Sequence, residues 1–498
     1  MIARLLGATI ALLALSAATA HADAQWIAAW GSTLTGSADP GPANATVRNI
    51  LRVSAGGQRI RIRVANPGES GPLVIGAASV AQPVEGVGPG IVPGTSRPIT
   101  FGGQPGVTLP PKTQAIYSDP VDLPVAAQQH LAVSLHLPAQ TEPPAYAATW
   151  NASYVSADGS GDLTRQDGGD GFGMLPTSAT GSMDGLPLNC AGCTTYALTA
   201  VDVLTTEADG AVVGLGSSTF HGYNSTPGGW NAILDLLAVR NTKEIPAGQR
   251  KAIVNAGIGG DTLHAGLDRI ERDVYSQSGV AAVALYDVND LGSRTAVEII
   301  EDYRIVITQA HARGDRVYCP TWPPAAQSAP STIRNNERRK LNTWILNSGE
   351  CDDIVDWDAV LRGAVVQDEY DPQYYSDGIH PNAAGHAAMA AATPLRWFNT
   401  APKPTTFASD LGLPSTGKCV SRRVFRIFLA NPRGTRLRSA RVYVGRKRVR
   451  VLRGARQLRA AIDLRGLPRG TVKVRIVGRG RNGRTYVRTR TYRTCAPK

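Results

Sequence analysis

The sequence predicts a multidomain protein with a central three-layer α/β domain built on a parallel sheet. An all-β sandwich or jelly roll over residues 25–204 is expected before it, and a small all-β domain over residues 418–498 after it. The first region has short alternating segments between Gly and Pro turns. The second alternates apolar runs with amphipathic ones, and the third returns to alternating segments rich in arginine.

The first 22 residues have the pattern of a secretory signal peptide. Arg4 precedes an apolar run over residues 5–15, and small residues follow as far as Ala22. This run is shorter than the about 18 apolar residues that a membrane anchor needs, and no later stretch is long and apolar enough to span a bilayer. We therefore expect a secreted, extracellular protein whose mature form has no transmembrane segment.

The six cysteines agree with an oxidising compartment. We expect them to pair in sequential order, although other connectivities stay open. The expected pairs are Cys190 with Cys193, Cys319 with Cys351, and Cys419 with Cys495. The short spacing of the first pair also occurs in zinc sites, but such a site needs a second close pair or histidines at ligand spacing, and the sequence has neither.

The region over residues 25–204 lacks helical periodicity, whereas the region over residues 205–400 alternates strands with helices. In the first, strands are expected at residues 58–64, 73–80, 98–101, 114–118 and 130–138. In the second, strands are expected to end near Gly216, Gly257, Val288, Pro320 and Trp357, with helices at residues 229–239, 294–313, 331–347 and 382–398. In such parallel sheets, functional sites form at the carboxyl ends of the strands.

Four segments of the second region place reactive side chains at strand ends or in loops beside them. They are Gly216-Ser217-Ser218, the glycine-rich stretch 255–262, Asn289-Asp290 and Asp377-Gly378-Ile379-His380. A serine nucleophile needs a base, the base needs an orienting carboxylate, and the oxyanion needs fixed donors. Taken alone, Asp377 and His380 could instead be a surface pair that caps the following helix.

In this order, the segments resemble the SGNH (GDSL-like) hydrolase family over residues 205–400, which implies a flavodoxin-like sheet. The resemblance implies Ser218 as nucleophile and Asp377 and His380 as the other triad members. It implies Ser218, Gly260 and Asn289 as the oxyanion hole. The implied activity is that of a serine esterase or acylhydrolase that uses no metal and no cofactor.

Two residues depart from the family pattern. Ser217 stands where the family has aspartate, which makes Ser217 an alternative nucleophile, although the spacing from Gly216 to Gly222 favours Ser218. Asp287 stands where the family has glycine, and a carboxylate there would oppose the charge on an oxyanion. The alternative function is therefore that of a catalytically impaired SGNH-fold protein that acts as a cell-wall or carbohydrate-binding module.

The substrate class stays open among acetylated carbohydrates, short-chain esters and lipids. An amino-terminal β-domain before an SGNH-like domain is similar to the layout of some secreted carbohydrate esterases, which favours carbohydrate. The scarcity of Phe and Met in the hydrolase region argues against a deep acyl tunnel.

The last part of the chain is strongly basic and follows a Pro- and Thr-rich linker over residues 401–417. Residues 419–498 carry 25 Lys and Arg against one acid, Asp463, so the net charge of +24 there leaves −11 for the rest of a chain of net charge +13. Such a surface is either simply solvated or attaches the protein to an anionic cell-wall polymer or to lipid headgroups. No nucleic-acid partner is expected, because no nucleic-acid-binding motif accompanies the charge.

Overall fold

The computed structural model describes most of the chain between residues 23 and 495. The described residues are 23–38, 41–68, 71–84, 88–140, 144–147, 152–174, 179–180, 194–226, 228–324, 332–364, 368–375, 377–399, 420–421, 426–427, 429, 436–445, 447–453, 462–463, 470–480 and 485–495. The predicted signal peptide, the predicted linker over 401–417, and Cys190, Cys193 and Cys419 lie outside them.

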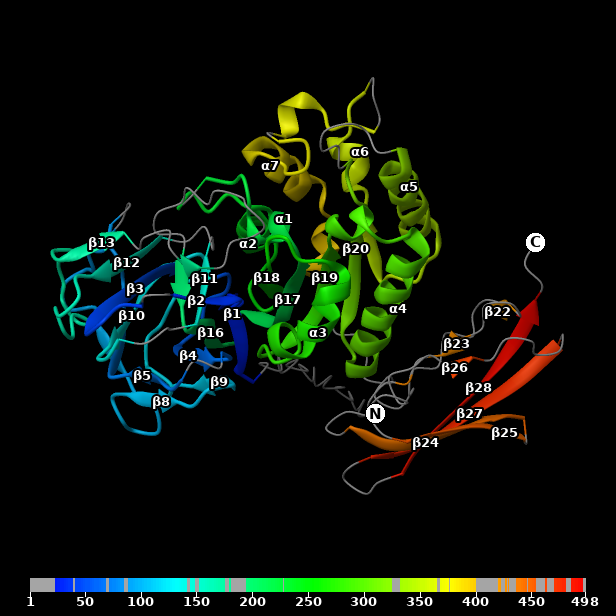
Figure 1. Ribbon diagram of the computed structural model, residues 1–498, viewed down its shortest axis with the longest axis horizontal. Helices are drawn as coiled ribbons and strands as arrows, with labels where there is room; N and C mark the ends of the chain where they lie inside the picture. The colour runs from blue at the N-terminus through cyan, green and yellow to red at the C-terminus, as the bar shows by residue number, and fades with distance from the viewer. Residues whose placement is uncertain are drawn as a thin grey trace, which may run out of the picture.

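Two antiparallel sheets form the amino-terminal β-sandwich (Figure 1). One consists of β1 (Gln25–Gly31), β16 (Leu198–Thr205), β4 (Arg59–Asn66) and β9 (Thr113–Tyr117). The other consists of β13 (Phe172–Met174), β12 (Ala152–Ser156), β3 (Ala45–Arg52), β10 (His130–Leu137), β6 (Ala77–Ala81) and β7 (Arg97–Ile99). Smaller sheets pair β14 (Ala179–Thr180), β2 (Gly36–Ala38), β11 (Pro144–Ala147) and β15 (Thr194–Tyr196), and β5 (Leu73–Ile75) with β8 (Val107–Leu109).

The sequence predicts one strand over residues 73–80, and this prediction is wrong. The segment is divided at Gly76 between β5 and β6, which belong to different sheets. Glycine in the middle of a strand commonly marks such a bend, because it has no side chain to pack. The other strands predicted in this region correspond to β4, β7, β9 and β10.

A five-stranded parallel sheet forms the α/β domain. Its order is β18 (Arg250–Gly257), β17 (Ala208–Gly216), β19 (Val280–Tyr286), β20 (Arg316–Pro320) and β21 (Asp353–Val355). The second strand along the chain lies outside the first, and the later strands follow on the other side, which is the flavodoxin-like order. These strands are almost wholly apolar because helices cover both faces of the sheet.

The helices fall into two groups, one on each side of the sheet (Figure 1). On one side α3 (Leu263–Asp273), α4 (Ala296–Arg313) and α5 (Thr332–Asn347) pack in succession. On the other lie α1 (Ser218–His221), α2 (Ile233–Glu244), α6 (Trp357–Leu361) and α7 (Ala383–Ala392), while η1 (Asn289–Gly292), η2 (Pro372–Tyr374) and η3 (Leu395–Trp397) are short 3-10 turns. The last predicted helix is interrupted at Pro394, since proline lacks the N–H that continues a helix.

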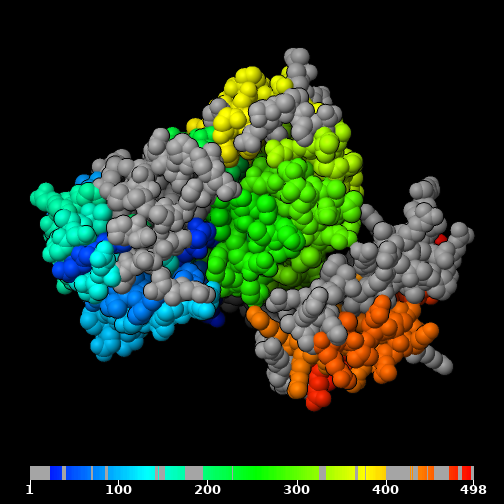
Figure 2. All heavy atoms as spheres, viewed as in Figure 1, coloured from blue at the N-terminus to red at the C-terminus, as the bar shows by residue number. Residues whose placement is uncertain are grey.

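The β-sandwich and the α/β domain share a continuous buried core. β1 runs beside the edge strand β18, and Figure 2 shows the two domains in direct contact. The Ser54 hydroxyl of the sandwich accepts the N–H of Ile253 at 2.9 Å, and the N–H of Ala28 donates to the Ser278 carbonyl at 3.0 Å. The sandwich therefore covers an edge of the parallel sheet that would otherwise be open.

The disulfide Cys319–Cys351 joins β20 to the segment before β21, as predicted. Of the three predicted pairs, this is the one for which the structure describes both cysteines in full. In the part of the chain described above, no helix is both long and apolar enough to cross a membrane.

The carboxy-terminal module has a small core of its own. Its main sheet has the order β22 (Val420–Ser421), β28 (Thr485–Cys495), β27 (Gly470–Gly480), β24 (Leu437–Val444) and β25 (Lys447–Arg453), beside the pair β23 (Arg426–Ile427) and β26 (Ile462–Asp463). Val442, Val474 and Ile476 are buried on one face, whereas Arg441 and Arg475 are exposed on the other. The alternation in sequence thus separates an apolar face from a cationic one.

Candidate active site

Ser218, His380 and Asp377 form a hydrogen-bonded chain. Ser218 Oγ lies 2.7 Å from His380 Nε2, and His380 Nδ1 lies 2.6 Å from Asp377 Oδ2. The Ser218 and His380 side chains are largely buried, and the carboxylate is partly exposed. The structure therefore brings together three residues that are up to 162 positions apart in the sequence.

Local structure fixes each of these side chains. Ser218 is the first residue of α1, directly after the buried strand β17. The other carboxylate oxygen, Asp377 Oδ1, accepts the backbone N–H groups of Ile379 at 3.0 Å and His380 at 2.8 Å, so the loop folds around the carboxylate. The cap of α7 is Asn382, whose side chain accepts the N–H of Gly385 at 3.0 Å. Asp377 is therefore not needed for helix capping.

The environment keeps Asp377 ionised. Burial alone would raise its pKa, but the hydrogen bond and charge of His380 and two backbone amides outweigh burial and lower the pKa to about 2. Because His380 Nδ1 donates to this carboxylate, Nε2 is the nitrogen left to accept the Ser218 proton.

Tyr223 and His386 support the imidazole, and the sequence analysis predicted neither role. The ring centroids of Tyr223 and His380 are 4.3 Å apart. His386 Nε2 donates to the Tyr223 carbonyl at 3.1 Å, and His386 Nδ1 accepts the Ile233 N–H at 3.2 Å. Burial lowers the pKa of His386 to about 4, so the neutral ring that these two bonds require is favoured.

The predicted oxyanion donors lie on the two loops that flank the end of β17. Gly260 follows β18 with a φ of +74°, a left-handed conformation that favours glycine. Asn289 follows β19, and its side-chain Nδ2 donates to the Asp261 carbonyl at 2.7 Å. This hydrogen bond ties the Asn289 loop to the Gly260 loop and leaves the amide one further N–H.

Residues 215–388 match the GDSL-like lipase/acylhydrolase family. The chain therefore contains a GDSL-like lipase/acylhydrolase domain. The chain is also similar to solved structures of 16–22% identity. A putative lipolytic protein of the G-D-S-L family from Desulfitobacterium hafniense is 16% identical, with 36% of this chain and 96% of that chain covered and a TM-score of 0.31.

The lipase/acylhydrolase from Enterococcus faecalis is 22% identical, with 39% of this chain and 100% of that chain covered and a TM-score of 0.30. An acetylxylan esterase from Geobacillus stearothermophilus is 18% identical, with 38% of this chain and 94% of that chain covered and a TM-score of 0.30. No curated protein matches the chain.

In the GDSL-like domain, Arg269 cross-links the strand ends that carry the site. Its guanidinium donates to the carbonyls of Gly216 at 3.1 Å and Ala256 at 2.7 Å, and to Asp261 Oδ2 at 2.6 Å. Arg269 lies on α3, a helix that the sequence analysis did not predict, so its role could not be anticipated. Asp290 caps the same helix through the Leu263 N–H at 2.6 Å.

The burial of Asp287 bears on the negative charge that the sequence analysis expected there. Its side chain is 1% exposed, and burial, followed by the charge of Asp290, raises its pKa well above the usual value. The protonated, uncharged carboxyl is therefore favoured. The expected negative charge beside the oxyanion donors is thus not supported, because a charge buried this deeply would be poorly solvated.

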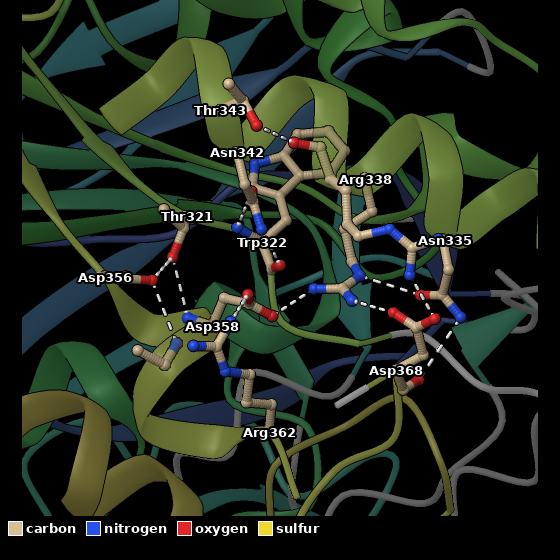
Figure 3. Close-up of polar contacts among 12 residues, drawn as sticks. Thr321, Trp322, Asn335, Arg338, Asn342, Thr343, Asp356, Asp358, Arg362 and Asp368 are labelled. Carbon is tan, nitrogen blue, oxygen red and sulfur yellow. Dashed lines mark hydrogen bonds and ion pairs between the residues drawn. The ribbon is translucent and has the colours of Figure 1, made fainter. Parts of the chain in front are cut away.

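A buried polar network holds the segment that leads to His380 (Figure 3). Arg338 of α5 forms an ion pair with Asp358 of α6 and donates to Asp368 Oδ1 at 2.9 Å. Two residues further along, the Tyr370 hydroxyl donates to the Ile379 carbonyl at 2.8 Å. In the GDSL-like domain, Arg338 therefore joins α6 to Asp368, and Tyr370 holds the Asp377–His380 loop.

Proposed function

We propose that the protein is a secreted serine esterase or acylhydrolase that acts through Ser218, His380 and Asp377. The observation that carries the proposal is the pair of contacts of 2.7 Å and 2.6 Å that link the three side chains. This arrangement has the nucleophile, the base and the orienting carboxylate in hydrogen-bond contact, which is the geometry of an activated serine. Family membership over residues 215–388 supports ester bonds as the substrate.

In the proposed reaction, His380 Nε2 takes the proton of Ser218 Oγ as the oxygen attacks the ester carbonyl. Asp377 holds the Nδ1 proton and stabilises the imidazolium. The amides of Ser218 and Gly260 and the Asn289 side chain bind the oxyanion. His380 then protonates the departing alcohol. In the second half of the reaction His380 takes a proton from water as the water attacks the acyl-enzyme, and passes it to Ser218 Oγ as the carboxylic acid leaves.

A fluorophosphonate probe tests the proposal, because it labels only an activated serine. We expect the folded protein to be labelled and to hydrolyse p-nitrophenyl acetate. No labelling, together with no hydrolysis of any ester, would refute the enzyme and favour the carbohydrate- or wall-binding alternative. Acetate release from acetylated xylan beside an ester chain-length series separates carbohydrate, short-chain ester and lipid substrates.

Replacing Asn289 by alanine should lower kcat by about 10²- to 10³-fold, the usual effect of removing one oxyanion donor. KM should change much less, because the lost hydrogen bond is stronger in the transition state than with the substrate. Asn336→Ala, an exposed asparagine on α5, is the matched control. An Asn289→Ala variant with wild-type kcat would remove Asn289 from the oxyanion hole.

We also propose that the carboxy-terminal module attaches the enzyme to an anionic cell-wall polymer. The exposed face of its sheet carries Arg441, Lys473, Arg475 and Arg479, beside exposed threonines such as Thr471. The opposite face is apolar and packs into the module's own core, so the cationic face is the one available to a partner. Attraction of this kind depends on charge and is weakened by salt.

Deleting residues 418–498 should abolish co-sedimentation with cell walls and leave the turnover of soluble esters nearly unchanged, since no member of the proposed triad lies there. The full-length protein should pellet at about 50 mM salt and stay in solution at about 500 mM, over which the screening length shrinks roughly threefold. A neutral polysaccharide is the control. Equal pelleting of both proteins, or pelleting that salt does not change, would refute the electrostatic attachment.

A further inference from the structure

Ser217 and Asp287 occupy facing positions at the ends of two neighbouring strands. β17 and β19 run parallel with Gly216 opposite Tyr286, so Ser217 and Asp287 follow as the next pair. The strands approach so closely here that a Cβ on Gly216 would lie 2.1 Å from the Tyr286 carbonyl oxygen. The two side chains therefore share one small space next to the nucleophile.

Both side chains are buried, and each has an unsatisfied polar atom. Ser217 is 0% and Asp287 1% exposed. Asp287 Oδ1 accepts the Asn289 N–H at 2.9 Å. Within the described residues, Asp287 Oδ2 and Ser217 Oγ have no hydrogen-bond partner of standard geometry, yet Ser217 is close enough to lower the pKa of this carboxyl. Each atom is thus suited to complete the hydrogen bonding of the other.

A hydrogen bond from the Ser217 hydroxyl to Asp287 Oδ2 gives both atoms a partner, while Oδ1 keeps the backbone amide of Asn289. A hydroxyl that donates to a carboxyl lowers the pKa of that carboxyl, and this is the direction in which Ser217 acts on Asp287. Burial, the largest effect, raises the pKa of Asp287 well above its usual value.

We propose that Ser217 and Asp287 act as one unit, a buried hydroxyl–carboxyl pair that positions the nucleophile's turn against the loop of Asn289. The proposal rests on the proposed esterase function, in which these segments carry the nucleophile and an oxyanion donor. It also unites the two departures from the family pattern, since the carboxyl that the family has at position 217 stands here at the facing position 287. Both residues are positioning residues.

A double-mutant cycle tests the pair with Ser217→Asp, Asp287→Gly and the double variant that exchanges the carboxyl between the two positions. Each single change should lower kcat on p-nitrophenyl acetate at least about tenfold. Ser217→Asp puts two carboxyls into one buried space, and Asp287→Gly removes the acceptor of the Asn289 N–H. If the two single losses were independent, they would multiply in the double variant. We expect the kcat of the double variant to be at least about tenfold higher than that product predicts. Losses that simply multiply would overturn the proposal.

Asp287→Asn separates positioning from packing, because the amide has the shape and the neutrality of the protonated acid. It should retain kcat far better than Asp287→Gly, and an equal loss would overturn the proposal. Melting temperatures are measured alongside, since a role in stability alone would change Tm and leave the kcat of the folded protein intact. If Asp287→Gly and the double variant both fail to fold, the exchange has not restored the pair and the proposal fails.

The proposed function and the pair fail in distinguishable ways. A wild-type protein that hydrolyses no ester and reacts with no fluorophosphonate refutes the esterase. The coupling is then measured in the melting temperatures of the same variants. Recovery of Tm in the double variant supports the pair, whereas additive losses of Tm refute it.

Discussion

Replacing Ser218 by alanine should lower ester turnover by about 10⁴- to 10⁶-fold and abolish fluorophosphonate labelling. The expected loss is this large because Ser218 Oγ is the one serine oxygen in contact with His380 among the residues that the structure describes, at 2.7 Å. The neighbouring hydroxyl of Ser217 is fully buried and faces Asp287 instead. Turnover and labelling measured on the same preparation test this expectation.

Ser217→Ala is the matched variant, since it removes an identical hydroxyl one residue away. It should lose roughly tenfold through poorer positioning and remain reactive with the probe. The reverse pattern, in which Ser218→Ala keeps its turnover and Ser217→Ala loses both turnover and labelling, would move the nucleophile to Ser217. Circular dichroism of both variants excludes misfolding as the cause.

Expressing residues 205–400 without the β-sandwich should yield an unfolded or aggregated fragment. The buried core runs without interruption from the sandwich into the parallel sheet, so removing the sandwich exposes apolar residues such as Val254 and Ile253 of β18. It also uncovers the edge of β18, and an open strand edge is a template for aggregation. Solubility, far-UV circular dichroism and a cooperative melting transition are the measurements.

The control is a fragment over residues 23–399, which keeps the sandwich and lacks the basic module. It should fold and melt cooperatively, because the module has a separate core. A soluble, cooperatively melting 205–400 fragment with wild-type turnover would show that the sandwich is dispensable. A single Ser54→Ala change should lower Tm, since it removes a buried hydroxyl that accepts the Ile253 N–H at 2.9 Å and donates to the Ala29 carbonyl at 2.7 Å.

The sequence predicted what depends on local pattern. Apolar runs located the strands, and the order of the motifs placed Ser218, Gly260 and Asn289 at neighbouring strand ends. What it missed depends on contacts between distant segments. Gly76 divides a predicted strand because two sheets meet there, and the role of Arg269 depends on three carbonyl or carboxylate groups that come from separate segments. The burial of Asp287, which raises the pKa of its carboxyl, likewise cannot be inferred from one position in a sequence.

The short junction between the first two domains restricts how the enzyme can move. Only Thr206 and Glu207 separate β16 from β17, and both strands are firmly paired within their own sheets. The short connection and the buried core that both domains share oppose hinged closure of the two domains around a ligand. Any adjustment to a bound ester must therefore come from the loops around Ser218, Gly260 and Asn289, while the sandwich stays fixed relative to the nucleophile.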